Sequence, residues 1–151
     1  FSRAASDLRG ATDRLAMRDR LRVLLVDDDE VLGRSLARSL QWSRLDVVPC
    51  TGVAALTLLR MEPVDVVATD FALHDRHGLG LLDDVAALAP RAGRVLFGAS
   101  VPQTVVDAAL RRRRIHAFLR TPFSGDDLVA AAATAAARAG VVDEGHPLTV
   151  H

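Results

Sequence analysis

Five short apolar runs alternate along this chain with segments whose apolar residues recur three and four positions apart. The runs are rich in β-branched residues, which is typical of buried strands, and the longer spacing is typical of helices. In the first helix, Leu32, Leu36 and Leu40 mark the expected inner face. We expect strands at 21–26, 46–50, 64–69, 94–97 and 116–120, and helices at about 30–42, 53–61, 79–88, 102–113 and 124–138.

This alternation predicts a parallel sheet with helices on both faces and right-handed crossovers. Five strands in roughly 120 residues fit a small doubly wound α/β sheet of strand order 2-1-3-4-5, in which strands 1 and 3 are neighbours. The domain is expected at 21–140, followed by a loose tail at 141–151 after Gly140. Residues 1–20 carry a weak heptad and are expected to be either a helical extension or linker, or a frayed solvated tail.

Three carboxylates follow two of the predicted strands. Asp27 and Asp28 come directly after the first strand, and Asp70 comes at the end of the third. Because these strands are expected to be neighbours, the three side chains should converge at one edge of the sheet, where open α/β sheets bind ligands. Carboxylates so close together either hold a proton or surround a cation, and oxygen ligands suit Mg²⁺. The alternatives are that Asp70 caps a turn and that Asp28 and Asp29 cap the next helix.

Composition narrows the chemistry. The 151 residues are half hydrophobic and one quarter charged, with 19 acidic and 19 basic residues, so no global charge points to nucleic acid. Lysine is absent, which excludes mechanisms that need an amine side chain, and the single cysteine, Cys50, excludes an internal disulfide and a cysteine-rich zinc site. No apolar run approaches the ~20 residues of a membrane span, and no signal peptide is visible. Because the chain begins with Phe1, it is open whether it is a piece of a longer protein.

The chain resembles a receiver domain of bacterial two-component response regulators over about residues 21–140. The resemblance rests on Val26-Asp27-Asp28 after the first strand, on Asp70 followed eight residues later by Gly78, and on Thr121-Pro122-Phe123 after the fifth strand. It implies a flavodoxin-like receiver fold with Asp70 as the phosphoacceptor. It also implies that Asp28 ligates Mg²⁺ directly and that Asp27 helps, partly through water. The backbone carbonyl of Ala72 would be a further ligand, and the Thr121–Pro122 bond would be cis.

The same resemblance implies partners. The phosphoryl donor would be a histidine kinase, a phosphotransfer protein or a small acyl phosphate, in the cytoplasm. The signal would pass to a downstream protein through the face formed by the fourth helix, the fifth strand and the fifth helix, and a homodimer stays open. We expect no direct binding of nucleic acid or membrane. We expect no enzyme activity beyond slow self-phosphorylation and dephosphorylation.

Two positions depart from the family pattern. The family usually has lysine before the cis-proline, where this chain has Thr121; Arg120 is adjacent, but successive strand residues point to opposite faces. The family usually has threonine or serine at the end of the fourth strand, where this chain has Ala99, or Ser100 if the register shifts by one residue. Phosphorylation depends most on the acids and the metal. The two departures therefore threaten the coupling of phosphate to conformational change.

Three further alternatives stay open. Phe118 lies where the family has its switching aromatic, or it is an ordinary core residue. The chain is either a phosphorylated receiver or a receiver-like interaction module that works without phosphate. Asp27-x-Asp29 is also similar to aspartate-based phosphatases of the haloacid dehalogenase type, which is disfavoured because no lysine and no cap insertion are present.

Overall fold

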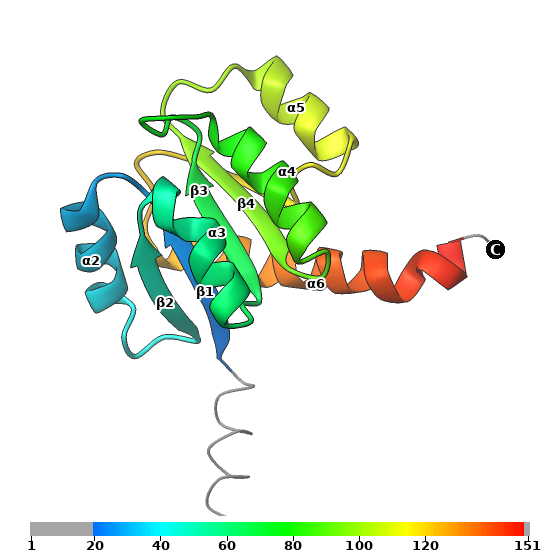
Figure 1. Ribbon diagram of the computed structural model, residues 1–151, viewed down its shortest axis with the longest axis horizontal. Coiled ribbons are helices and arrows are strands. Elements are labelled where there is room, and N and C mark those ends of the chain that lie inside the picture. Colours follow the sequence, from blue (N-terminus) through cyan, green and yellow to red (C-terminus); the bar gives the residue numbers. More distant parts are fainter. Residues whose placement is uncertain (1–19, 150–151) are drawn as a thin grey trace, which may run out of the picture.

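The computed structural model describes the backbone of residues 20–149 and the side chains of residues 20–140. The extension expected at 1–20 therefore lies, apart from residue 20, outside the described residues. Strands and helices alternate from the first described element to the last (Figure 1). In chain order they are β1 (Leu21–Val26), α2 (Glu30–Ser39), β2 (Leu45–Cys50), α3 (Gly52–Met61), β3 (Val66–Asp70), α4 (Gly78–Leu88), β4 (Gly93–Gly98), α5 (Gln103–Arg111), β5 (Ala117–Arg120) and α6 (Gly125–Thr149).

The five strands form one parallel sheet of order β2-β1-β3-β4-β5, which confirms the predicted doubly wound topology. Strands β1 and β3 are hydrogen-bonded neighbours, with Val26 paired to Thr69 at their carboxyl ends. Pro49 lies in β2 at the sheet edge, where a residue without a backbone N–H is tolerated. The strand order therefore reverses at the β1–β3 pair.

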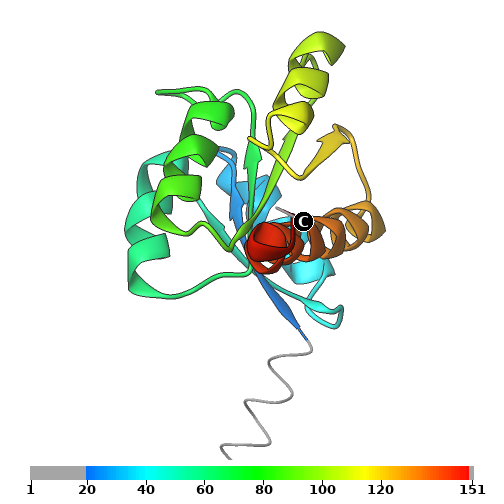
Figure 2. The same cartoon turned by 90° about the vertical axis from the view of Figure 1, so that its right-hand side faces the viewer.

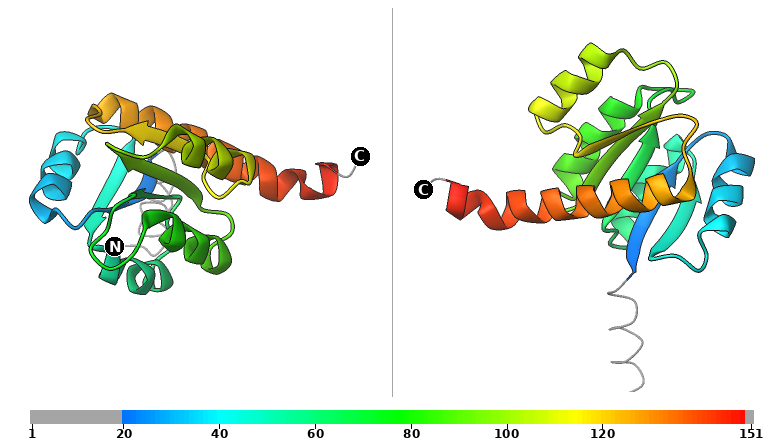
Figure 3. Two further views of the ribbon diagram at one scale, coloured as in Figure 1. Left: turned by 90° about the horizontal axis from the view of Figure 1, so that it is seen from above. Right: turned by 180° about the vertical axis from the view of Figure 1, so that it is seen from behind.

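Each face of the sheet has its own core. Helices α3, α4 and α5 cover the face that carries Leu24, Val26 and Val67. Helices α2 and α6 cover the opposite face, which carries Leu25 and Ala68. The view from above in Figure 3 separates α6 from α3 and α4 on the two sides of the sheet. Successive strand residues thus serve opposite layers, as the period of two requires.

Helix α2 differs from its predicted inner face. Leu40 is buried as expected, but Leu32 is 51% exposed, so its assignment to the core was wrong. The reason is that Gly33 is the buried residue of this helix, and its backbone lies so close to Pro49 that a Cβ would be 3.2 Å away. The helix also ends at Ser39 rather than near Trp42, which is 91% exposed.

Helix α6 is longer than predicted. Its backbone stays helical to Thr149, past Gly140, and its last part extends beyond the sheet (Figures 1 and 2). The loose tail expected at 141–151 is therefore helical as far as Thr149. An isolated glycine costs a helix about 1 kcal/mol relative to alanine, and the alanine-rich sequence before it has the highest helix propensity. None of the helices within residues 20–149 is apolar enough over a sufficient length to span a membrane.

Candidate functional site

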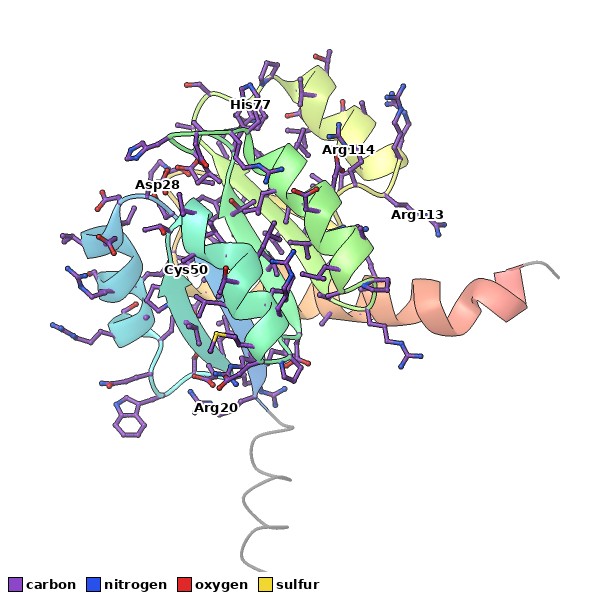
Figure 4. The ribbon with its side chains drawn as sticks, viewed as in Figure 1. Arg20, Asp28, Cys50, His77, Arg113 and Arg114 are labelled. Carbon is purple, nitrogen blue, oxygen red and sulfur yellow. The ribbon has the colours of Figure 1, made fainter. Side chains whose placement is uncertain are left out.

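The predicted carboxylates lie at the carboxyl end of the sheet, around the β1–β3 pair. Asp70 is the last residue of β3, and Asp27 and Asp28 follow β1. The amide of Asp27 donates to the carbonyl oxygen of Cys50, so the β1–α2 loop starts against the end of β2. In Figure 4, Asp28 and His77 mark this upper end of the sheet, and Arg20 marks the opposite end.

Asp27 and Asp70 share one cavity of about 270 Å³, which we call the α2 cavity. Its walls come from α2, from the carboxyl ends of β1, β3 and β4, and from residues 121–123. Burial raises the pKa of the Asp27 carboxyl, and the charge of Asp70 raises it further, against the N–H of Asp29, which donates to Asp27 at 2.9 Å. Burial likewise raises the pKa of Asp70, although the N–H of Ala72 donates to it at 3.4 Å. The charge of Asp70 thus acts on Asp27, the charge of Asp28 acts on Asp70, and the described residues that line the cavity include no basic side chain.

Asp28 is held differently. Its two carboxylate oxygens accept hydrogen bonds from the backbone N–H of His74 at 2.6 Å and of Gly52 at 3.1 Å. These donors, His74 first, lower the pKa of Asp28 despite its partial burial. Asp28 therefore faces the start of α3 and the β3–α4 loop, while Asp27 and Asp70 face the α2 cavity. The three acids lie at one end of the sheet, and the charge of Asp28 raises the pKa of both Asp27 and Asp70, although Asp28 does not line the α2 cavity.

The donor types nevertheless suit a hard cation. Among the described side chains of residues 20–140, no three histidine, cysteine, aspartate or glutamate residues are arranged as a metal site. Asp27 and Asp70 offer oxygen donors from partly buried carboxylates whose raised pKa a divalent cation would relieve, and Nδ1 of His74 lies 3.6 Å from the carboxylate of Asp28. Asp28 retains acceptor capacity beyond its two hydrogen bonds, because each carboxylate oxygen has two lone pairs. The residues Asp27, Asp28, Asp70 and Ala72 thus fit Mg²⁺ by chemistry, without forming a ready-made cage.

Gly78 shapes the loop after Asp70. Its N–H donates to the carbonyl oxygen of Phe71 at 2.7 Å, and a Cβ on it would lie 2.1 Å from the carbonyl oxygen of Asp70. A side chain at this position would displace the acceptor's own backbone. Ala72 and His77 form an antiparallel bridge that closes the loop between them. This close approach is the physical reason for a glycine eight residues after Asp70.

The switch positions lie around the same end of the sheet. Thr121 lines the α2 cavity, and its bond to Pro122 is cis, as the resemblance implies. Arg120 turns away, because its guanidinium donates to the carbonyl oxygens of Ala99 and Val101, each at 3.2 Å. No lysine, arginine or histidine is among the described residues that line the cavity.

Phe118 was expected to be either a switching aromatic or an ordinary core residue, and it has features of both. Its ring is half-buried and packs against the core beneath α5, as an ordinary core residue would. The guanidinium of Arg120 lies over this ring, 5.0 Å from its centroid, so the aromatic is covered from the outside. Ala99 and Ser100 are both exposed just after β4, and the carbonyl of Ala99 rather than a hydroxyl is engaged.

Two side features are structural. Residues 111–114 form a run of four arginines, in which Arg114 forms a two-pronged pair with Asp83 of α4 at 2.7 and 3.1 Å and Arg113 has a left-handed φ of 58° just past the end of α5. Both lie away from Asp28 in Figure 4. Cys50 ends β2, and burial raises the pKa of its thiol to about 12, which keeps it protonated at neutral pH.

Sequence reasoning identified the acids but missed what holds them. The N–H groups of Gly52 and His74 fix Asp28 across about 24 and 46 residues of chain, and backbone amides leave no trace in the residue type. The role of Gly98 was also missed. A Cβ there would meet Val101 at 2.7 Å and the carboxylate of Asp70 at 3.9 Å, so this glycine leaves room beside Asp70.

Comparisons with known proteins agree with this geometry. A family model described as a response regulator receiver domain matches residues 23–133. No curated protein matches significantly. Among solved structures, an adenylate cyclase from Rhodopirellula baltica is 23% identical with a TM-score of 0.74, over 86% of this chain and 97% of that chain. The signal receiver domain of an HD domain-containing protein from Pseudomonas fluorescens is 24% identical with a TM-score of 0.70, over 83% and 93%. A receiver domain protein from Clostridium thermocellum is 19% identical with a TM-score of 0.69, over 81% and 98%.

Proposed function

The chain belongs to the response regulator receiver domain family, and from that premise we propose that Asp70 accepts a phosphoryl group in two-component signal transduction. The observation that carries the proposal is the position of Asp70, which ends the central strand β3 and faces a solvent-connected cavity beside Asp27. An aspartate presented in this way can act as a nucleophile and carry an acyl phosphate. We propose residues 21–140 as the unit that does so.

The transfer forms a bond between a carboxylate oxygen of Asp70 and the phosphorus of a phosphohistidine. The bond from phosphorus to the histidine nitrogen breaks, and that nitrogen leaves with its electron pair. Asp27, Asp28 and the backbone carbonyl of Ala72 are the proposed oxygen ligands of Mg²⁺, which when bound neutralises charge on the phosphoryl oxygens. Asp70 must be ionised to attack, so its raised pKa favours transfer at neutral rather than acidic pH.

The proposed donor is a histidine kinase or a phosphotransfer protein in the cytoplasm, with small acyl phosphates as substitutes. The proposed output is contact with a downstream protein through α5, β5 and α6, and we propose no catalytic activity beyond slow turnover of the phosphate on Asp70. No nucleic acid partner is part of the proposal.

A second candidate function is a phosphate-independent interaction module. The observation that favours it is Arg120, which ties the residues after β4 through the carbonyl oxygens of Ala99 and Val101 and covers Phe118. With Thr121 in the cavity and no basic side chain lining it, a phosphoryl group on Asp70 has no described cation to bind. The segment that would respond to phosphate is thus already held by other contacts.

Intact-mass spectrometry after incubation with an acyl phosphate and Mg²⁺ tests the first candidate. We expect one added phosphate that is lost in base, absent when Mg²⁺ is omitted, absent in Asp70→Asn and retained in Asp126→Asn, which changes an exposed acid outside the cavity. No added phosphate from either an acyl phosphate or a cognate kinase would refute phosphorylation. If partner binding is the same for wild type and Asp70→Ala, the phosphate-independent module is supported instead.

A further inference from the structure

The turn between α5 and β5 has a strained backbone. Among the described residues, Arg113 alone has a positive φ, of 58°, and it lies just past the end of α5. Its N–H donates to the carbonyl oxygen of Leu110 at 3.1 Å. The next N–H, of Arg114, donates to the carbonyl oxygen of Ala109 at 2.9 Å. Helices that end with this pair of hydrogen bonds usually have glycine at the left-handed position, because a Cβ there crowds the backbone. The arginine therefore costs stability that a glycine would not.

The backbone of this turn is held from the protein side. The buried guanidinium of Arg94 donates to the carbonyl oxygen of Arg113 at 2.7 Å and to that of Arg114 at 3.0 Å. The side chain of Arg114 is paired with Asp83 of α4. In Figure 4, Arg113 projects outward beyond the end of α5, while Arg114 lies towards α4. The turn thus has a fixed backbone and presents the side chain of Arg113 to solvent.

Three guanidinium groups on this turn have no acid to bind. Arg111, Arg112 and Arg113, which we call the arginine turn, are all exposed. Within the described residues, none of these three side chains forms a hydrogen bond or an ion pair. A cation near the last turn of a helix is favourable because of the helix dipole, but this effect does not require a charged residue at the left-handed position. The chain as a whole has no net charge, so the arginine turn is a local excess of positive charge.

We propose that the arginine turn binds an acidic segment of a partner protein, whose aspartate and glutamate carboxylates accept hydrogen bonds from the three guanidinium groups. Arg114 provides an example of this contact within the same run, because it holds the carboxylate of Asp83 with two hydrogen bonds at 2.7 and 3.1 Å. The planar guanidinium matches a carboxylate in this two-pronged way. This surface goes beyond the proposed phosphorylation of Asp70 and does not depend on it.

Two other anionic partners fit the arginine turn less well. Affinity for nucleic acid grows with the number of phosphates contacted, and three side chains on one turn reach few of them. Anionic membranes bind clusters of about four to eight basic residues, and stable binding needs a second, apolar anchor. None of the large exposed apolar side chains of the described chain lies between residues 103 and 120. A short acidic protein segment therefore fits the size and the chemistry of this surface.

The test is a nuclear magnetic resonance titration of the full chain with hexaglutamate at low salt. We expect this peptide to shift the backbone amides of residues 111–115, and the uncharged hexaglutamine to leave them in place. Salt at about 0.5 M should abolish the shifts, because the contacts are exposed. A short DNA duplex and vesicles that contain phosphatidylserine should each bind roughly tenfold more weakly than hexaglutamate. No shift with hexaglutamate at millimolar concentration, or tighter binding of the DNA or the vesicles, would overturn the proposal.

The substitution Arg113→Gly separates binding from folding, because its two expected effects have opposite signs. Glycine adopts the left-handed conformation freely, so the urea concentration at the midpoint of unfolding should rise. The lost guanidinium should weaken the binding of hexaglutamate by about threefold to fivefold. Arg113→Lys keeps the charge and should bind within about twofold of wild type.

The matched control is Arg60→Gln, which removes an exposed arginine from the last turn of α3. It should change neither the midpoint of unfolding nor the affinity for hexaglutamate. Wild-type affinity in Arg113→Gly, or an equal loss in Arg60→Gln, would locate the binding elsewhere and overturn the proposal. A lower midpoint of unfolding in Arg113→Gly would also contradict it, because Arg113 would then serve the fold rather than a partner.

Discussion

Two parts of the sheet treat buried polar groups in opposite ways: the amino ends of β4 and β5, called the amino end below, and the carboxyl ends of β1 and β3, called the carboxyl end. At the amino end, Arg94 is 7% exposed, and its guanidinium donates at 2.7 and 3.0 Å to two backbone carbonyl oxygens just past α5. Its backbone N–H donates to Nδ1 of His116 at 2.9 Å, and the carbonyl of His116 accepts from Arg138 of α6. At the carboxyl end, Asp27 and Asp70 face a cavity that no basic side chain lines.

The difference separates stability from chemistry. The amino end joins β4, β5, α5 and α6 through satisfied hydrogen bonds, which buried polar groups require if they are not to destabilise the fold. The carboxyl end leaves two acids with raised pKa values in the α2 cavity, which costs stability and suits the proposed binding of a cation. Substitutions at the amino end should therefore cost stability, and substitutions of the acids should cost function while stabilising the fold.

The largest loss of stability is expected at Arg94. Replacing it with methionine keeps most of the volume but leaves the two backbone carbonyl oxygens past α5 without their donor. We expect the free energy of unfolding to fall by about 2–4 kcal/mol, measured by urea denaturation. As a control, Arg112→Met changes an exposed arginine just past α5 and should change the free energy of unfolding by less than about 0.5 kcal/mol. Equal effects of the two substitutions would mean that the amino end is not held by these hydrogen bonds.

A smaller loss is expected at Gly78, this time at the carboxyl end. An alanine Cβ would lie 2.1 Å from the carbonyl oxygen of Asp70, so the backbone of the acceptor must move. We expect Gly78→Ala to cost roughly 2 kcal/mol of unfolding free energy and to lower the yield of phosphate on Asp70. The matched control is Gly80→Ala two residues later, where the nearest atom belongs to the flexible side chain of Arg76 at 3.2 Å. That substitution should be neutral or stabilise the helix by up to about 1 kcal/mol, and a similar loss at both glycines would contradict the steric argument.

The sequence predicted the carboxyl end better than the amino end, and the reason is physical. Apolar runs and helical spacing determine which segments are strands and helices, and the parallel order then places Asp70 beside Asp27. Arg94 lies inside an apolar strand run, and nothing in its neighbours indicates that its guanidinium would reach the end of α5. Contacts of that kind depend on how α5 and β5 pack, which no local pattern contains.

The same limit applies within the site. The sequence predicted three acids at one edge of the sheet, but it did not predict that Asp28 accepts hydrogen bonds from the amides of Gly52 and His74. The prediction that Leu32 faces the core was wrong for a related reason. The rotation of α2 about its axis follows the close approach of Gly33 to Pro49. The α2 cavity could not be predicted at all, because a cavity is defined by volume that side chains leave unfilled.

Removing the charge of Asp70 should reveal the cost carried by the carboxyl end. Because burial raises the folded pKa above the ordinary value of 3.8, the folded state holds this proton more tightly than the unfolded state. Stability therefore falls as the pH rises from 3.8 through the folded pKa, and the penalty is fully present above the folded pKa. We expect Asp70→Asn to be more stable than wild type at pH 7 by less than the loss at Gly78, with the difference shrinking towards pH 3 in denaturation curves. A variant less stable than wild type at pH 7 would mean that the carboxylate is compensated after all.

The smallest effect is expected for the exposed ion pair between Asp83 and Arg114, which lies close to the buried hydrogen bonds of Arg94. The two side chains are 48% and 37% exposed, and although the pair is two-pronged, solvent and salt screen it. We expect Asp83→Asn to lower the unfolding free energy by less than about 1 kcal/mol at low salt and by almost nothing at about 1 M salt, while the loss in Arg94→Met persists in both. If Asp83→Asn instead costs as much as Arg94→Met, the strength of the amino end comes from its surface charges. Buried, satisfied hydrogen bonds would then not be what distinguishes the two ends of the sheet.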